Sequence, residues 1–144
     1  MATRQRLLRI SFYSKRNPKL TEAGFRKHWT EIHAPLANKW LAKHGIIRYN
    51  QLHTPLSMKE LGIGANPAFQ HLPWLEYDGV AEFWTTDIQN LNRAFQDPYC
   101  LENVYPDEHE LFDFASNRWN VGWEEVFVKD GKPVNPQAHQ DTPT

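Results

Sequence analysis

The 144-residue chain has a single cysteine, Cys100, which cannot form an internal disulfide and is typical of a protein from a reducing compartment. It has no surplus of positive charge either, because its formal net charge is −1. That balance argues against a surface that follows the phosphates of a nucleic acid. No apolar run is long enough for a transmembrane helix or a secretory signal peptide. We therefore expect a cytoplasmic protein with neither a nucleic-acid nor a membrane partner.

Sequence motifs for the common cofactors are missing as well. No Gly-x-Gly-x-x-Gly run, phosphate loop or Gly-x-Ser-x-Gly pattern occurs, so nucleotide, flavin and acyl-enzyme chemistry have no support. The seven histidines also lack metal-ligand spacing. On a helix, His28 and His33 would point about 140° apart. We expect neither a cofactor nor a protein-bound metal.

Aromatic residues, in contrast, make up 13% of the chain and include six tryptophans. Large aromatic side chains can fill a core or an interface, and they can also stack on a flat ligand. The composition leaves both roles open.

The stretch from Thr21 to Gly45 gives the strongest secondary-structure signal. Its apolar residues have helical spacing and predict one buried stripe; they are Phe25, Trp29, Ile32, Leu36 and Trp40. Pro35 has no N–H and crowds the preceding turn, so we expect a kink or break there. His33 lies just before this defect, about 40° around the helix from Trp29. Its imidazole either forms a local hydrogen bond or points into a cavity beside the core.

The rest of the chain predicts short strands and helices in alternation. Strands are expected over residues 6–13, 46–54, 78–85 and 117–128, and helices over residues 87–96 and 107–115. Residues 55–77 are expected to form a long loop with one helical turn at residues 58–61, and such loops often serve as lids or binding loops. We predict one domain over residues 1–129 and a polar, proline-containing tail over residues 130–144.

This order of elements predicts an α+β fold, namely a ferredoxin-like antiparallel sheet with helices on one face. Several strands carry apolar residues on both faces, as Leu7 and Leu8 do at the start of the first strand. No further helix is available to cover the second face. A second copy of the chain is the simplest cover, and we expect a homodimer.

Several neutral acid/base groups remain as candidates for chemistry. Histidine exchanges protons near neutral pH without a cofactor, which suits lyase or isomerase reactions on an enolisable or phenolic substrate. The catalytic candidates are His33, Tyr49, His53, Asp78 and His109. The candidates for substrate binding are Gln51, on the strand face shared by Tyr49 and His53, and the aromatic residues Trp29, Trp84 and Trp119.

Two segments give these residues a wider context. Residues 28–36 read His-Trp-Thr-Glu-Ile-His-Ala-Pro-Leu, and residues 78–84 read Asp-Gly-Val-Ala-Glu-Phe-Trp. With the strand before them, they resemble the EthD-domain family of dimeric α+β-barrel proteins. The flanking residues look most like the fungal subgroup of aromatic polyketide pathways, which includes decarboxylases of atrochrysone carboxylic acid. The resemblance covers residues 6–128. It implies a homodimer with a cofactor-free pocket between the sheet and the helices of each subunit, and a functional His33.

The first functional hypothesis is a lyase that decarboxylates a hydroxylated aromatic polyketide acid. His33 would be the proton donor, helped by His53 or His109. Tyr49 and Asp78 would hold phenolic oxygens, and Trp84 or Trp119 would stack on the ring. Two alternatives stay open, namely a dehydratase or cyclase that uses the same groups and a non-catalytic carrier of a flat hydrophobic metabolite.

Overall fold

A four-stranded antiparallel sheet forms the centre of the computed structural model, which describes residues 4–135 and 139–140. Its strands are β2 (Leu8–Arg16), β3 (Arg48–His53), β4 (Gly79–Thr85) and β5 (Phe112–Trp123). They lie in the order β3-β4-β2-β5, so the first and third of these strands along the chain pair in the middle. This is the ferredoxin-like arrangement, and the predicted fold class is confirmed.

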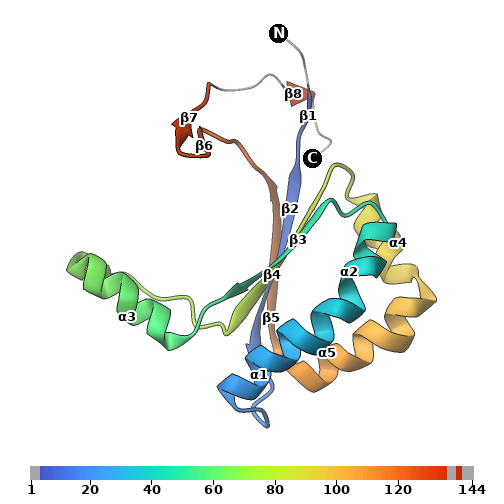
Figure 1. The fold of residues 1–144 in the computed structure, drawn as a ribbon, viewed down its shortest axis with the longest axis horizontal. Helices are drawn as coiled ribbons and strands as arrows, with labels where there is room; N and C mark the ends of the chain where they lie inside the picture. Colours follow the sequence, from blue (N-terminus) through green and yellow to red (C-terminus); the bar gives the residue numbers. More distant parts are fainter. Residues whose placement is uncertain (1–3, 136–138, 141–144) are drawn as a thin grey trace.

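The helices that pack on the sheet all lie on one of its faces (Figure 1). They are α1 (Glu22–His28), α2 (Ala34–Lys43), α4 (Gln89–Gln96) and α5 (Tyr105–Leu111). The hydrophobic core lies between these helices and the sheet, where side chains such as Ile10, Leu41 and Val104 are almost completely buried. Within the described part of the chain, no helix packs on the opposite face.

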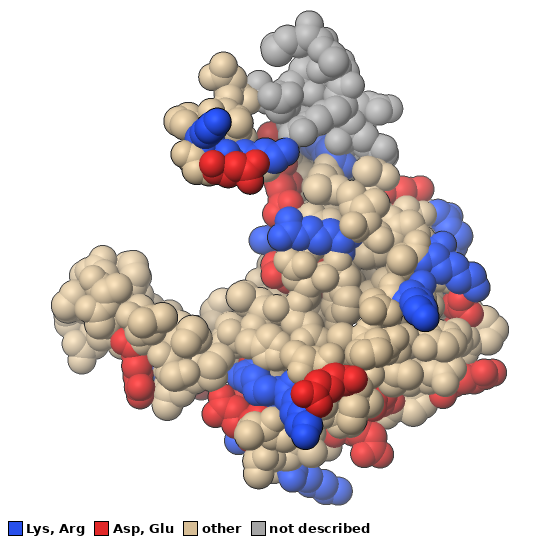
Figure 2. Space-filling view, in the orientation of Figure 1, with Lys and Arg blue, Asp and Glu red and all other residues tan. Residues whose placement is uncertain are grey.

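The segment between β3 and β4 projects away from the sheet as an arm (Figure 1). It contains α3 (Leu56–Ala65) and the 3₁₀ helix η2 (Pro67–His71). The segment therefore contains more helix than the single turn predicted at residues 58–61. The arm is rich in exposed apolar side chains, namely Leu56, Met58, Leu61, Phe69, Leu72 and Leu75. Figure 2 shows little charge on its visible face. The arm therefore presents apolar surface without burying it in this chain.

Pro35 does not end the helix that contains it. Between α1 and α2 the chain forms a π-helical turn, η1 (Trp29–His33), in which the Ala34 N–H donates to the Trp29 carbonyl. The wider turn accommodates a proline that cannot make the ordinary bond four residues back. The predicted irregularity is thus present as a π turn and not as a break. A second π turn, η3 (Cys100–Val104), precedes Pro106 in the same way.

The last predicted helix and strand have different boundaries in the structure. α5 ends at Leu111, not at Ala115, and β5 begins at Phe112, five residues before the predicted start. Phe112 and Asp113 pair with the end of β2, so backbone pairing with a distant strand outweighs the local helical pattern.

Short strands lie near both ends of the described chain, with one at its start and three after β5. β6 (Val128–Lys129) and β7 (Lys132–Pro133) form a hairpin, whose turn residues Asp130 and Gly131 have φ values of 52° and 76°. An Asp-Gly turn with two positive φ angles is the favoured hairpin geometry. The predicted boundary after residue 129 falls inside this hairpin.

β1 (Arg4–Gln5) pairs in parallel with β8 (His139–Gln140). Residues 1–3 of the predicted domain, and residues 136–138 and 141–144 of the predicted tail, lie outside the described residues.

Among the described residues, no helix combines the length and the apolar character needed to cross a membrane.

Candidate active site

A cavity of about 200 Å³ lies between the helical layer and the sheet. Its walls are mainly aromatic and are formed by Phe12, Trp29, Trp40, Tyr49, Phe83, Phe95, Phe112 and Phe114. Its polar lining residues are Ser14, His33, Glu108 and Asn117. Aromatic walls with a few polar groups are typical of small-molecule sites.

The π turn brings two of these residues onto the same face of the helix. Trp29 and His33 stand at its two ends, and both line the cavity. Trp29 packs tightly against β4 at Gly79, where an added Cβ would lie 2.3 Å from the indole Cζ3 atom. Only glycine allows this close approach. The indole N–H of Trp29 is buried and has no hydrogen-bond partner in the described part of the chain.

His33 is hydrogen-bonded to a carboxylate from another helix. Its Nδ1 lies 2.8 Å from Oδ2 of Asp107, while Nε2 of His28 lies 2.7 Å from Oδ1 of the same residue. His33 is 4% exposed, and this burial lowers its pKa below the ordinary value of 6.5, against the opposing effect of Asp107. When neutral His33 donates its Nδ1–H to Asp107, Nε2 keeps a lone pair. The arrangement suits a general base.

Glu108 is the acid/base group that the sequence analysis missed. It follows Asp107 in the first turn of α5 and lines the cavity opposite the sheet. Burial, together with the neighbouring Asp107 carboxylate, raises the pKa of Glu108 to about 7. Consecutive acidic residues at a helix start are ordinarily explained by the helix dipole, so the sequence carried no distinct signal for either residue.

Tyr49 is the second predicted catalytic residue that the structure brings to the cavity. Its ring stacks on Phe83 with 5.3 Å between ring centroids. Burial raises the pKa of Tyr49, against the opposing effect of a hydrogen bond with the Gln51 side chain. The phenol therefore keeps its proton and can donate a hydrogen bond to a ligand.

His53 and Gln51 share a strand face with Tyr49, as predicted, but they lie behind Trp29 and do not line the cavity. Gln51 Nε2 donates a hydrogen bond to the Trp29 carbonyl at 2.8 Å. The His53 ring packs against the Trp29 indole, with 4.5 Å between ring centroids. His53 Nδ1 also lies 3.2 Å from an Arg26 nitrogen. Burial, and then the Arg26 charge, lower the pKa of His53. The two side chains support Trp29 and the turn that contains it.

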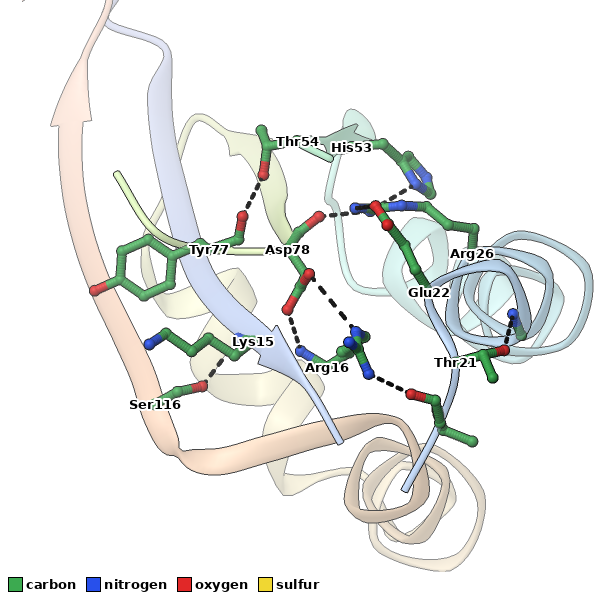
Figure 3. Close-up of polar contacts among 12 residues, drawn as sticks. Lys15, Arg16, Thr21, Glu22, Arg26, His53, Thr54, Tyr77, Asp78 and Ser116 are labelled. Carbon is green, nitrogen blue, oxygen red and sulfur yellow. Dashed lines mark hydrogen bonds and ion pairs between the residues drawn. The ribbon is translucent and has the colours of Figure 1, made fainter. Parts of the chain in front are cut away.

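Asp78 lies outside the cavity and holds backbone segments together (Figure 3). Its Oδ2 accepts the Arg16 backbone N–H at 2.8 Å, at the end of β2. Its backbone carbonyl accepts a hydrogen bond from Arg26 of α1 at 2.5 Å. The predicted contact between Asp78 and substrate therefore has no geometric basis. A strand start looked available to a ligand because its long-range partners were not visible in the sequence.

The remaining three candidates are dispersed. His109 is exposed on α5 and stacks on Phe114, with 4.0 Å between ring centroids. Trp84 lies on the sheet face opposite the cavity, since it follows the lining residue Phe83 in β4, and its indole donates to Glu124 at 2.5 Å. Trp119 is 65% exposed, but its ring stacks on that of the lining residue Phe12, with 6.5 Å between ring centroids. Trp119 therefore lies beside the cavity.

No group of three or more His, Cys, Asp or Glu residues is arranged to hold a metal ion within residues 4–135 and 139–140.

Comparisons with known proteins agree with this architecture. The sequence pattern of the EthD domain matches residues 17–115. A conidial pigment biosynthesis dehydratase, EthD, of Metarhizium robertsii is 31% identical over 90% of this chain and 91% of its own. Dehydratase aurZ of Gibberella zeae is 34% identical over 88% of this chain and 82% of its own. Decarboxylase claH of Passalora fulva is 28% identical over 90% and 83%.

The crystal structure of an EthD family protein from Bacillus halodurans has a similar fold. It superposes with a TM-score of 0.54 at 17% identity and covers 83% of this chain and 98% of its own. The domain match, which spans more than half of the sequence, and the relatives above 30% identity lead to one conclusion: the chain belongs to the EthD domain family.

Proposed function

We propose that this chain is a cofactor-free lyase that removes water from a hydroxylated aromatic polyketide in secondary metabolism. The observation that carries the proposal is that two acid/base groups, His33 and Glu108, line one aromatic-walled cavity. His33 is neutral at neutral pH because burial lowers its pKa, whereas Glu108 retains its proton up to about pH 7. A neutral imidazole and a protonated carboxyl are the base and the acid that an elimination requires.

In the proposed reaction, Nε2 of His33 removes a proton from the carbon next to a substrate ketone. That electron pair forms the new C=C bond while the adjacent C–O bond breaks, and Glu108 gives its proton to the leaving hydroxyl. Tyr49 donates a hydrogen bond to the ketone oxygen, where negative charge develops. The reaction leaves His33 protonated and Glu108 ionised, and proton exchange with water restores both groups.

Loss of CO2 from an aromatic polyketide carboxylic acid is the second candidate. It is favoured by the relative named decarboxylase claH, and the same Glu108 acid could protonate the ring carbon that bears the carboxylate. However, the described residues that line the cavity include no Lys or Arg to pair with an ionised carboxylate. An unpaired buried charge is costly, so we rank dehydration first.

The test is to incubate purified, chelator-treated protein with a hydroxytetralone and, separately, with a naphthol-type carboxylic acid. Mass spectrometry distinguishes a product lighter by water from one lighter by CO2. In heavy water, decarboxylation also leaves one deuterium on the carbon that lost the carboxylate. Loss of water supports the first proposal, and loss of CO2 replaces it with the second.

Two variants make the result specific to the cavity. His33→Gln removes the proposed base, whereas His44→Gln changes a histidine that pairs with Asp97 away from the cavity. Of these two variants, only His33→Gln should lower kcat, by about 10²- to 10⁴-fold. If both substrates bind tightly and neither is converted, both enzyme proposals fail, and the chain is a carrier.

A further inference from the structure

Asp107 is shared between two histidines from different parts of one long helix. His28 is the last residue of α1, and His33 is the last residue of the π turn η1. Their ring nitrogens lie 2.7 Å and 2.8 Å from the two oxygens of the Asp107 carboxylate. The side chain of His33 is 5% exposed, whereas that of His28 is 24% exposed. The carboxylate thus connects a buried histidine of the cavity to one that contacts solvent.

The donor pattern of the carboxylate restricts the state of both rings. An ionised carboxylate only accepts hydrogen bonds, so each histidine nitrogen facing it carries a proton. Asp107 therefore selects the Nδ1–H tautomer of His33, and Nε2 remains the nitrogen free to take a proton from a ligand. Because His28 donates to Oδ1, it draws negative charge from the carboxylate and weakens its attraction for a protonated His33.

We propose that Asp107 and His28 form a positioning pair for His33, in which Asp107 fixes the ring tautomer and His28 limits the basicity of the imidazole. The inference rests on the proposed function, where His33 is the base. Neither Asp107 nor His28 lines the cavity, so both act through His33. The other titratable groups that line the cavity near His33 are Glu108 from α5 and Tyr49 from β3, while β5 presents the Phe112 ring.

The opposing possibility is that Asp107 only ties α1 to α5. Nitrogen-15 NMR of the histidine side chains separates the two, because it reports the tautomer and the titration of each ring without turnover. The His33 signals are identified by their loss in His33→Gln. Wild-type His33 should be in the Nδ1–H form at neutral pH.

Asp107→Leu keeps the size of the side chain and removes both acceptors, and it should abolish the Nδ1–H preference of His33 and lower kcat by about 10²-fold or more. If this variant does not fold, Asp107→Ala gives the same reading. Retention of the wild-type tautomer in the folded variant overturns the assignment of Asp107.

His28→Phe keeps an aromatic ring but removes the donor. It should raise the titration midpoint of His33 by about one pH unit, because a full carboxylate charge stabilises the imidazolium more strongly. His28→Gln retains an N–H donor and should keep the midpoint near that of the wild type. His44→Phe, at the matched pair with Asp97, should leave His33 unchanged.

An unmoved midpoint in His28→Phe overturns the role of His28, even if the variant loses stability. The NMR result is also independent of the reaction. If the tautomer and titration behave as expected and no substrate is converted, the positioning pair stands and the proposed function fails. If substrate is converted and the NMR signals do not respond, the reverse holds.

Discussion

Replacement of Glu108 by Gln tests the electrostatics of the cavity through stability. In the unfolded chain Glu108 ionises near its ordinary pKa of 4.5, whereas in the fold its pKa is about 7. The folded state therefore holds a proton that the unfolded state has lost between these pH values, so stability falls as pH rises through this range. At about 1.4 kcal/mol per pKa unit, the penalty reaches about 3 kcal/mol above pH 7 and disappears below pH 4.5.

Glu108→Gln removes the ionisation and keeps the shape of the side chain. We expect the variant to be more stable than the wild type by up to about 3 kcal/mol near pH 8 and nearly equal to it near pH 4.5. Urea unfolding followed by circular dichroism at the two pH values measures the difference. Glu110→Gln, at an exposed position of the same helix, is the control and should show little change. A stability difference for Glu108→Gln that does not depend on pH would refute the reasoning.

Four further outcomes are expected. His33→Gln should lower kcat by about 10²- to 10⁴-fold in a folded protein, measured by turnover; wild-type turnover would make His33 a structural residue. With increasing pH, kcat should rise as His33 loses its proton, at a pH below its ordinary pKa of 6.5, and should fall near pH 7 as Glu108 ionises. A kcat that does not change with pH across this range contradicts the acid/base pair. Asp78→Ala should lower the free energy of unfolding by about 1–3 kcal/mol, because the Arg16 N–H loses its acceptor. The variant should keep the wild-type kcat. A stable variant that has lost turnover would instead make Asp78 a catalytic residue. Light scattering should give a homodimer of twice 16.9 kDa, since exposed apolar residues such as Trp119 need cover, and a stable monomer would contradict this prediction.

The sequence by itself determined the order of the elements and three of the residues that line the cavity, namely Trp29, His33 and Tyr49. The helical spacing correctly predicted that Phe25, Trp29 and Trp40 are buried. It was wrong for Ile32, which is 52% exposed, because the π turn places His33 on the buried face instead. Pro35 marked the irregular turn, although the sequence did not show that it is a π turn. Alternation along β3 correctly grouped Tyr49, Gln51 and His53 on one face. These features depend on neighbours within one or two turns or along a single strand, so local patterns contain them.

Only the tertiary structure decided which of these groups meet. Asp107 and Glu108 are 74 or more residues from His33 along the chain, and the packing of α5 beside η1 brings the three together. The same packing partly removes Glu108 from water and raises its pKa. Trp84 points to the other face of the sheet, and the Asp78 carboxylate accepts the Arg16 backbone N–H. Desolvation and hydrogen-bond partners are properties of the assembled core, and a linear pattern does not encode them in any one segment. For that reason the sequence indicated His33, although as a proton donor, whereas Glu108 became a candidate only in the folded structure.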